Sequence, residues 1–201
     1  MDIHSSFIHG KNFKCGKSVI IEDDVIVGDD VELEHNVTLK SGTRIMDRVS
    51  LASYVNTTGL CIIGNDVTAR TGACISRSVI INDKAFIGPG VITNHTRNLM
   101  WQRNLPEVQL ITRIGYGAII GSTSSLIAGL TIGDNIVIAA GSNVYKDLLE
   151  PGVYVGVKKI KELEPEFILQ RPESYYEYKF CEELLRKYLP KWIGFRREES
   201  K

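Results

Sequence analysis

The chain has 201 residues, and its 24 lysines and arginines are balanced by 24 aspartates and glutamates. This length fits one domain with a small appendage, and the balanced charge gives no electrostatic reason to expect nucleic acid as a partner. No apolar run reaches the ~18 residues of a membrane span, so we expect no membrane insertion. The four cysteines form no CxxC pair and the first residues lack the regions of a signal peptide, which predicts free thiols and a cytoplasmic location.

A six-residue repeat occupies residues 9–92. Written in sixes from His9, ten of fourteen units begin with Ile, Leu or Val, and nine have Val in the fifth place. The period is not helical, and the repeated residues are β-branched types that favour strands. We therefore expect a solenoid of short parallel strands in which three units make one coil, coils stack ~4.8 Å apart, and equivalent residues recur every 18 positions. Gly28, Gly64 and Gly88 are interpreted as corner residues with positive φ.

The repeat breaks after Thr93 and resumes out of phase at Ile114. If residues 93–98 form the last unit before the break, residues 99–113 make an extruded loop of fifteen residues. The loop carries Trp101 and follows Arg97. Its large apolar side chains predict that it covers a surface, because such groups are costly to leave in water.

The repeat continues through residues 114–149 and is absent from Glu164 onward. In the tail, large apolar residues recur every four positions, which predicts an amphipathic helix from Ser174 to Leu189; these residues are Tyr176, Phe180, Leu184 and Tyr188. We expect this helix to cover the exposed end of the solenoid or to pack on a neighbouring subunit. The predicted division is a solenoid domain at 1–160 and a helical extension at 161–201.

The repeat resembles the hexapeptide repeat of the left-handed parallel β-helix. The stretch TRIGYGAIIGSTSSLIAGLTIGDNIVIAAGSNVYKD resembles the terminal coils of bacterial acyltransferases that use acyl-CoA, and PGVYVGVKK resembles the exit from those coils. A third stretch resembles the nucleotide-sugar N-acetyltransferases of surface-glycan synthesis. It consists of GPGVITN, a loop, and the pattern T-x-x-G-x-G-A. The resemblance implies an all-β, left-handed parallel β-helix with an extruded loop and a C-terminal helix.

The same resemblance implies an enzyme that moves an acetyl group from acetyl-CoA to the amine of a nucleotide-linked amino sugar, for surface polysaccharide synthesis. It implies a homotrimer with active sites in the grooves between subunits, and no metal. A neutral imidazole is suited to accept the proton that the attacking amine loses. His95 is the candidate base, and Asn94 precedes it in the family's characteristic element.

Acetyl-CoA needs a donor for the oxyanion, a straight polar edge for pantetheine and cations for its phosphates. The oxyanion donor is expected to be a backbone N–H of Gly121 or Ser122, with Gly115 as the alternative. The candidates for the edge and for the phosphates lie later in the chain: Ala139, Ala140, Gly141, Ser142, Lys146, Lys158 and Lys159. Lysines near a chain's exit from a repeat can also be merely solubilising.

The acceptor is expected to contact Arg77, Arg97 and Trp101. Arg77 precedes His95 by 18 residues and should lie directly below it, where its guanidinium suits the phosphate of a sugar nucleotide. A solvated surface arginine is the competing interpretation of Arg77.

Three other functions stay open. O-acetylation of a sugar or small alcohol needs the same site, and some similar sugar N-acetyltransferases use no histidine base. A zinc hydro-lyase resembling γ-type carbonic anhydrase needs three histidines per site, whereas His35 and His95 are predicted on different sides of the triangle. A non-catalytic solenoid leaves the CoA-like terminal coils unexplained.

Overall fold

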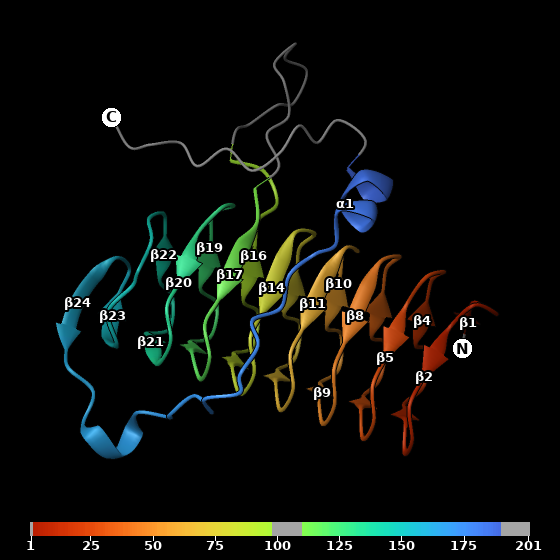
Figure 1. Ribbon diagram of the computed structural model, residues 1–201, viewed down its shortest axis with the longest axis horizontal. Coiled ribbons are helices and arrows are strands. Elements are labelled where there is room, and N and C mark those ends of the chain that lie inside the picture. The colour runs from red at the N-terminus through yellow and green to blue at the C-terminus, as the bar shows by residue number, and fades with distance from the viewer. Residues whose placement is uncertain (1, 98–109, 190–201) are drawn as a thin grey trace, which may run out of the picture.

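The computed structural model describes residues 2–97 and 110–189. Within them the chain winds into a solenoid whose three sides are parallel sheets, here called sheets A, B and C (Figure 1). Each coil contributes one strand to each sheet in turn. The all-β solenoid predicted from the repeat is confirmed.

The strands are short, and almost all contain two or three residues. Sheet A contains β1 (Asp2–Ile3), β4 (Ile20–Ile21), β7 (Thr38–Leu39), β10 (Asn56–Thr57), β13 (Cys74–Ile75), β16 (Ile92–Thr93), β19 (Ser125–Leu126) and β22 (Asn143–Val144). Sheet B contains β2 (Ile8–His9), β5 (Ile26–Val27), β8 (Thr43–Ile45), β11 (Cys61–Ile63), β14 (Val79–Ile81), β17 (Thr112–Ile114) and β20 (Thr131–Ile132).

Sheet C contains β3 (Lys14–Cys15), β6 (Glu32–Leu33), β9 (Ser50–Leu51), β12 (Thr68–Ala69), β15 (Phe86–Ile87), β18 (Ile119–Ile120), β21 (Ile136–Ile138), β23 (Gly152–Val155) and β24 (Lys158–Lys161). The last pair, β23 and β24, is antiparallel and ends the sheet. A 3₁₀ helix, η1 (Pro165–Phe167), and one α-helix, α1 (Glu182–Tyr188), follow. β24 ends one residue beyond the predicted boundary at 160, and the division into two domains stays a prediction.

Strands pair with their equivalents at an offset of 18 residues, as Ile62 does with Ile80, which confirms the predicted coil. The repeated first and fifth residues of the units point inward and form one core. Leu51, Val55 and Ile87 in the first array, and Ile120 and Ile138 in the second, are all at most 1% exposed. Burying two apolar side chains per unit is the main force that holds the coils together.

Across the predicted loop the pairing offset rises to 33 residues, as between Thr93 and Leu126, so fifteen residues are inserted into an 18-residue coil. The predicted loop length is therefore confirmed, although residues 98–109 lie outside the described part. The predicted end at Arg113 is wrong, since Thr112 and Arg113 already belong to β17 and pair with Val79 and Ile80. Thr112 is a polar residue in a place where the repeat has apolar ones, which hid the strand's start.

The coil has three corners, named after the sheets that they join: A/B, B/C and C/A. At the B/C corner, a side-chain carboxylate or amide oxygen accepts a hydrogen bond from a backbone N–H of the preceding coil. The accepting residues are Asp29, Asp47, Asn65, Asp83 and Asp134.

The interpretation of Gly28, Gly64 and Gly88 as positive-φ residues is wrong. Positive φ falls two residues later, at Asp30, Asp66 and Gly90.

Close packing of the coils explains these three glycines instead. A Cβ at Gly28 would lie 2.3 Å from the Asp47 carboxylate of the next coil, and one at Gly64 would lie 2.5 Å from that of Asp83. At Gly88 it would lie 2.7 Å from backbone atoms of the next coil. The missing side chain therefore allows one coil to approach the next.

The tail lies along the side of the solenoid, on sheet B, and runs opposite to the direction in which the coils stack (Figure 1). Leu169 bonds Asn135 near one end, Tyr178 bonds Asp83 midway, and Tyr188 bonds Asp24 near the other end. The expectation that the tail covers the open end of the solenoid is therefore wrong for its described residues.

The predicted helix at Ser174–Leu189 is also wrong in length, because α1 begins only at Glu182. Tyr175 and Tyr178 hydrogen-bond Asn82 and Asp83 from an extended segment, and these bonds outweigh the local helical pattern. Tyr176, which the pattern placed on the apolar face, is 75% exposed. Leu185 of the short helix and Leu189, the residue that follows it, do pack on Leu60.

All four cysteines are free thiols, which confirms that part of the composition argument. Among residues 2–97 and 110–189, no helix is long and apolar enough to cross a membrane.

The core packing makes a quantitative prediction. The inward-facing residues at equivalent positions of successive coils form a stack, here called a column. Leu51→Ala removes a fully buried side chain from a column and should lower the free energy of unfolding by about 2–5 kcal/mol, because a cavity remains. Ser50→Ala, the neighbouring outward-facing position, should change it by less than about 0.5 kcal/mol. Denaturant unfolding measures both, and equal effects would contradict the inward assignment of the column.

Candidate functional site

The predicted site residues fall on the two edges of sheet A. His95, Asn94 and Arg77 lie at the A/B corner, whereas Gly121 and Ser122 lie at the C/A corner, as do Ala139, Ala140 and Gly141. One side of the triangle, roughly 15 Å of extended chain, separates the two edges within one subunit. Gly115 follows β17 at the B/C corner, away from both groups, so it does not join either.

At the A/B corner, His95 is half-buried at the beginning of the inserted loop. Ile92 pairs with Cys74, and if this 18-residue register continues past the strands, His95 follows Arg77 in the stack. The side-chain amide of Asn94 donates to the Leu126 carbonyl at 3.1 Å, as its backbone N–H does at 2.9 Å. Asn94 is thus fixed to the next coil, and of the predicted pair only His95 has a side chain that can act as a base. Arg97 is exposed, and Trp101 lies outside the described residues.

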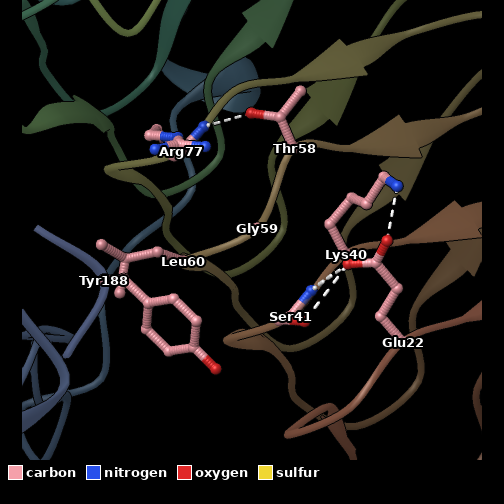
Figure 2. A pocket seen from close by; sticks show the side chains of 8 residues that line it. All are labelled: Glu22, Lys40, Ser41, Thr58, Gly59, Leu60, Arg77 and Tyr188. Atoms are coloured by element: carbon pink, nitrogen blue, oxygen red, sulfur yellow. Dashed lines mark hydrogen bonds and ion pairs between the residues drawn. The ribbon is translucent and has the colours of Figure 1, made fainter. Parts of the chain in front are cut away.

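A pocket of about 390 Å³ opens along the same corner, in the coils that precede His95 (Figure 2). Its lining comprises Glu22, Lys40, Ser41, Thr58, Gly59, Leu60, Arg77 and Tyr188. Burial raises the pKa of Glu22, but hydrogen bonds from Lys40 and Ser41 outweigh burial, and the net pKa is lowered. Glu22 therefore stays a carboxylate whose charge Lys40 balances.

The wall that Tyr188 contributes is held by Asp24. The Tyr188 hydroxyl donates to Asp24 at 2.7 Å, and the Lys187 ammonium donates to the same carboxylate oxygen at 2.8 Å. Arg44 donates to the other oxygen at 2.7 Å. Burial raises the pKa of Asp24, but these three donors outweigh it and bring the pKa to about 2.

At the C/A corner the coils of Gly121 and Ala139 stack directly, through Gly121 N–H to the Ile138 carbonyl and Gly141 N–H to the Ser122 carbonyl, both at 2.8 Å. A Cβ at Gly121 would lie 2.5 Å from the Ala140 nitrogen, so this glycine is required by packing. A Cβ at Gly141 would meet nothing within 4 Å, which leaves the backbone open on that side. In the described part of the chain, the N–H groups of Ser122 and Ala140 donate to no protein acceptor.

The remaining predicted CoA residues separate into different roles. Ser142 is buried, and its hydroxyl donates to the Ala139 carbonyl and accepts from the Gly156 N–H, so it holds the β23–β24 turn against the C/A corner. Lys158 follows this turn and is exposed. Lys159 forms ion pairs with Glu162 at 2.7 Å and Glu150 at 3.6 Å.

Lys146 differs from the other candidates in its position. It follows β22 and therefore lies at the A/B corner, across sheet A from the open backbone edge. Within one subunit the structure thus brings Lys158, but not Lys146, near the predicted CoA edge.

His35 lies at the C/A corner, where its Nδ1 accepts the Lys17 N–H at 2.9 Å. His35 and His95 are therefore on different corners, as the repeat predicted. Residues 2–97 and 110–189 contain no group of three or more His, Cys, Asp or Glu side chains that could hold a metal ion.

Comparisons with known proteins agree with this architecture. No family model matches the chain. In the solved structure of a UDP-N-acetylglucosamine acyltransferase from Campylobacter jejuni, the fold matches with a TM-score of 0.55 at 14% identity, over 77% of this chain and 71% of that one. The chain therefore has the β-helix fold of that structure.

The curated relatives are longer proteins. The bifunctional protein GlmU of Stenotrophomonas maltophilia is 34% identical over 110 residues, which are 54% of this chain and 22% of the relative. GlmU of Buchnera aphidicola is 29% identical over 132 residues, 63% of this chain and 25% of the relative. The chain thus spans about a quarter of the curated relatives that it matches, and the resemblance predicted from the repeat holds for this hexapeptide-repeat region.

Hydroxyl side chains in the apolar columns are a signal that the sequence analysis missed. Beside the A/B corner the columns contain four buried threonines, and beside the C/A corner two buried serines: Thr43, Thr57, Thr93, Thr112, Ser124 and Ser142. Each one bonds corner backbone, as Thr57 does with the Lys40 N–H at 3.0 Å and Ser124 with the Ser142 N–H at 3.2 Å. Column hydroxyls therefore mark the corners that carry candidate site residues.

The hydrogen bonds of Asp24 predict that loss of its negative charge weakens the docking of α1, which forms the pocket wall. Because the pKa of Asp24 is about 2, its stabilisation of α1 is present above its ordinary value of 3.8 and is lost as the pH falls toward 2. Asp24→Asn imitates that loss at neutral pH and should weaken helix docking by about 1–3 kcal/mol. Hydrogen exchange of residues 182–189 measures this change.

Asp23→Asn is the matched control. Asp23 is the adjacent carboxylate, but it accepts from the Ser41 hydroxyl and does not bind α1. Equal helix protection in the two variants would show that Asp24 does not hold the pocket wall.

Proposed function

We propose that the protein is an acetyltransferase that moves the acetyl group of acetyl-CoA to the amine of a nucleotide-linked amino sugar, for surface polysaccharide synthesis. The observation that carries this proposal is the 18-residue register of β13 and β16, because on this register Arg77 and His95 follow equivalent strands of successive coils where the inserted loop begins. A base and a cation on neighbouring coils suit the transfer of an acetyl group to an acceptor that carries a phosphate. The C. jejuni neighbour, by its name an acyltransferase of a nucleotide sugar, supports the same substrate class.

Acyl transfer would use the groups on both edges of sheet A. The neutral His95 imidazole takes the proton of the amine as its nitrogen attacks the thioester carbonyl. The tetrahedral oxyanion accepts a hydrogen bond from a backbone N–H, for which Ser122 and Ala140 are suited because their N–H groups have no protein acceptor in the described chain. The intermediate then expels the CoA thiolate, and the proton held by the imidazole neutralises it.

The C/A corner is the proposed CoA edge. Its exposed backbone at Ala140 and Gly141 is suited to the amide groups of pantetheine, and Lys158 beside it is suited to a phosphate. Ala139 is less suited, because its N–H donates to the Tyr154 carbonyl and its own carbonyl accepts from the Ser142 hydroxyl. Lys159 is a weaker candidate, because Glu162 and Glu150 already balance its charge. The acceptor would lie on the other edge, against Arg77, with Arg97 before the inserted loop and Trp101 of the loop as further contacts.

Because the two edges lie on opposite sides of sheet A, we propose a homotrimer in which the A/B corner of one subunit faces the C/A corner of the next. The tail occupies sheet B, so sheets A and C are the faces left for assembly. The outward residues of sheet A support this choice, since from β4 to β22 they are uncharged: Ile20, Thr38, Asn56, Cys74, Ile92, Ser125 and Asn143. Ile92 is 49% exposed and would be buried in such an interface.

A cytoplasmic location is proposed as well, because free thiols and acetyl-CoA are both expected there. O-acetylation is the second candidate reaction within this proposal. The same imidazole would serve it, and the acceptor's nucleophile is what distinguishes the two.

The direct test is thiol release from acetyl-CoA with a panel of nucleotide-linked amino sugars, together with the corresponding hydroxyl sugars and simple amines. Turnover with a nucleotide-linked amine supports the proposal, and turnover with the hydroxyl sugars alone moves it to O-acetylation. No turnover with any acceptor, together with no CoA binding by calorimetry, would overturn it.

Substitution of the proposed base gives the second test. His95→Ala should lower kcat by about 10²–10⁴-fold, because the proton then leaves without a positioned acceptor. His35→Ala, which removes an imidazole from another corner, should leave kcat unchanged. A loss of less than tenfold for His95→Ala would show that the amine loses its proton without this residue.

A further inference from the structure

The pocket at the A/B corner carries a charge that its own lining does not compensate. Its two cations are Lys40 and Arg77 and its one carboxylate is Glu22, so the lining carries one net positive charge. Lys40 binds Glu22 at 2.5 Å, which cancels that pair. The remaining charge is the Arg77 guanidinium.

Arg77 is half-buried, and only its backbone N–H has a described bond, to Thr58. Within residues 2–97 and 110–189 its guanidinium has no carboxylate partner. A guanidinium that has lost part of its hydration is stabilised by an anion that accepts from its planar fork, and phosphate does so with two parallel bonds. Arg77 therefore gives the pocket the chemistry of a phosphate site.

The pocket is kept open by Gly59, which has a φ of +92°. A Cβ there would lie 2.5 Å from the Ser41 carbonyl and 3.5 Å from the Lys40 side chain, both of which line the pocket. The Lys40–Glu22 pair lies to one side of Gly59 and Arg77 to the other (Figure 2). The Ser41 and Thr58 hydroxyls add polar groups on the same floor.

The outer wall comes from the tail. Tyr188 of α1 packs against Gly42 and Leu60, and its hydroxyl is bound by Asp24, so the ring is fixed at the pocket. An aromatic ring beside a phosphate site provides an apolar surface for the organic part of a phosphorylated ligand. The tail thus completes a pocket that the coils alone would leave open on this side.

The register places this pocket with respect to the proposed base. Arg77 lies one coil before His95, and Lys40 and Ser41 lie three coils before it. Glu22 lies one coil further from His95, because it precedes Lys40 by 18 residues. At ~4.8 Å for each coil, the pocket extends from about 5 to 19 Å from the level of His95. A sugar bound at His95 with its phosphate toward the earlier coils would bring that phosphate to Arg77.

We propose that this pocket binds the diphosphate of the acceptor, with Arg77 as the phosphate ligand and Tyr188 as the wall against its organic part. The proposal rests on the proposed function, whose acceptor it assigns to nucleoside diphosphate sugars. CoA also carries a diphosphate, but its proposed edge is the C/A corner, across sheet A from this pocket.

Calorimetry on the full chain tests the proposal without turnover. The probes are uridine, guanosine and thymidine diphosphates, inorganic pyrophosphate and CoA, each titrated alone. We expect at least one nucleoside diphosphate to bind and Arg77→Gln to weaken that binding at least tenfold. Arg48→Gln is the matched control, since Arg48 is an exposed arginine at the B/C corner that is paired with Asp66.

The wall is tested with Tyr188→Ala, which should weaken binding of the nucleoside diphosphate more than binding of pyrophosphate. Tyr176→Ala removes an exposed ring from the same tail and should change neither. An equal effect of Tyr188→Ala on both probes would overturn the assignment of Tyr188.

Three results would overturn the pocket itself. These are no binding of any nucleoside diphosphate at millimolar concentration, unchanged binding by Arg77→Gln, or an Arg77→Gln effect on CoA alone. If Arg77-dependent binding is found without acetyl transfer, the proposed function fails and the pocket stands. If transfer is found with Arg77-independent binding, the pocket fails and the function stands.

Discussion

The structure depends on the stacking of each inward-facing side chain on its equivalent in the next coil. No coil can bury its own apolar residues, so every coil is stable only through its neighbours. This constraint fixes the pairing offset of 18 residues, as between Ile62 and Ile80, and it explains glycines such as Gly28 that allow close approach. It also makes the corners a place where residues can be inserted without loss of the core, and the inserted loop and the candidate site residues lie at corners.

The two candidate edges differ in what they offer a ligand. The C/A corner presents backbone, with the Ser122 and Ala140 N–H groups unused by the described protein and with no side chain at Gly141. The A/B corner presents side chains, among which Arg77 carries a charge that the described protein does not balance. An edge of backbone groups suits a long flexible carrier such as CoA, whichever acyl group it carries. Charged side chains suit one particular acceptor. This contrast supports the division of one reaction between two corners.

The sequence predicts the solenoid, its register and the inserted length, because one physical rule repeats fourteen times in the first array. It fails where tertiary contacts outweigh local pattern. Thr112 begins β17 although the column is otherwise apolar, and Tyr175 and Tyr178 keep the tail extended by bonding Asn82 and Asp83. The pocket was not predictable, since Tyr188 and Gly59 are far apart in sequence and nothing in the repeat connects them. Column hydroxyls such as Thr57 were visible in the sequence, but only the structure shows which corner they mark.

The path of the tail has a consequence for how the protein is made. A solenoid of this kind can form coil by coil as the chain leaves the ribosome, because each coil needs only the one before it. The tail is synthesised after these coils, yet it returns to Asp24 in an early one, so its contacts join segments 164 residues apart in sequence. A nascent chain can therefore possess all its coils while Tyr188 is still absent. The pocket is completed only after the scaffold, so the solenoid can fold before its binding site forms.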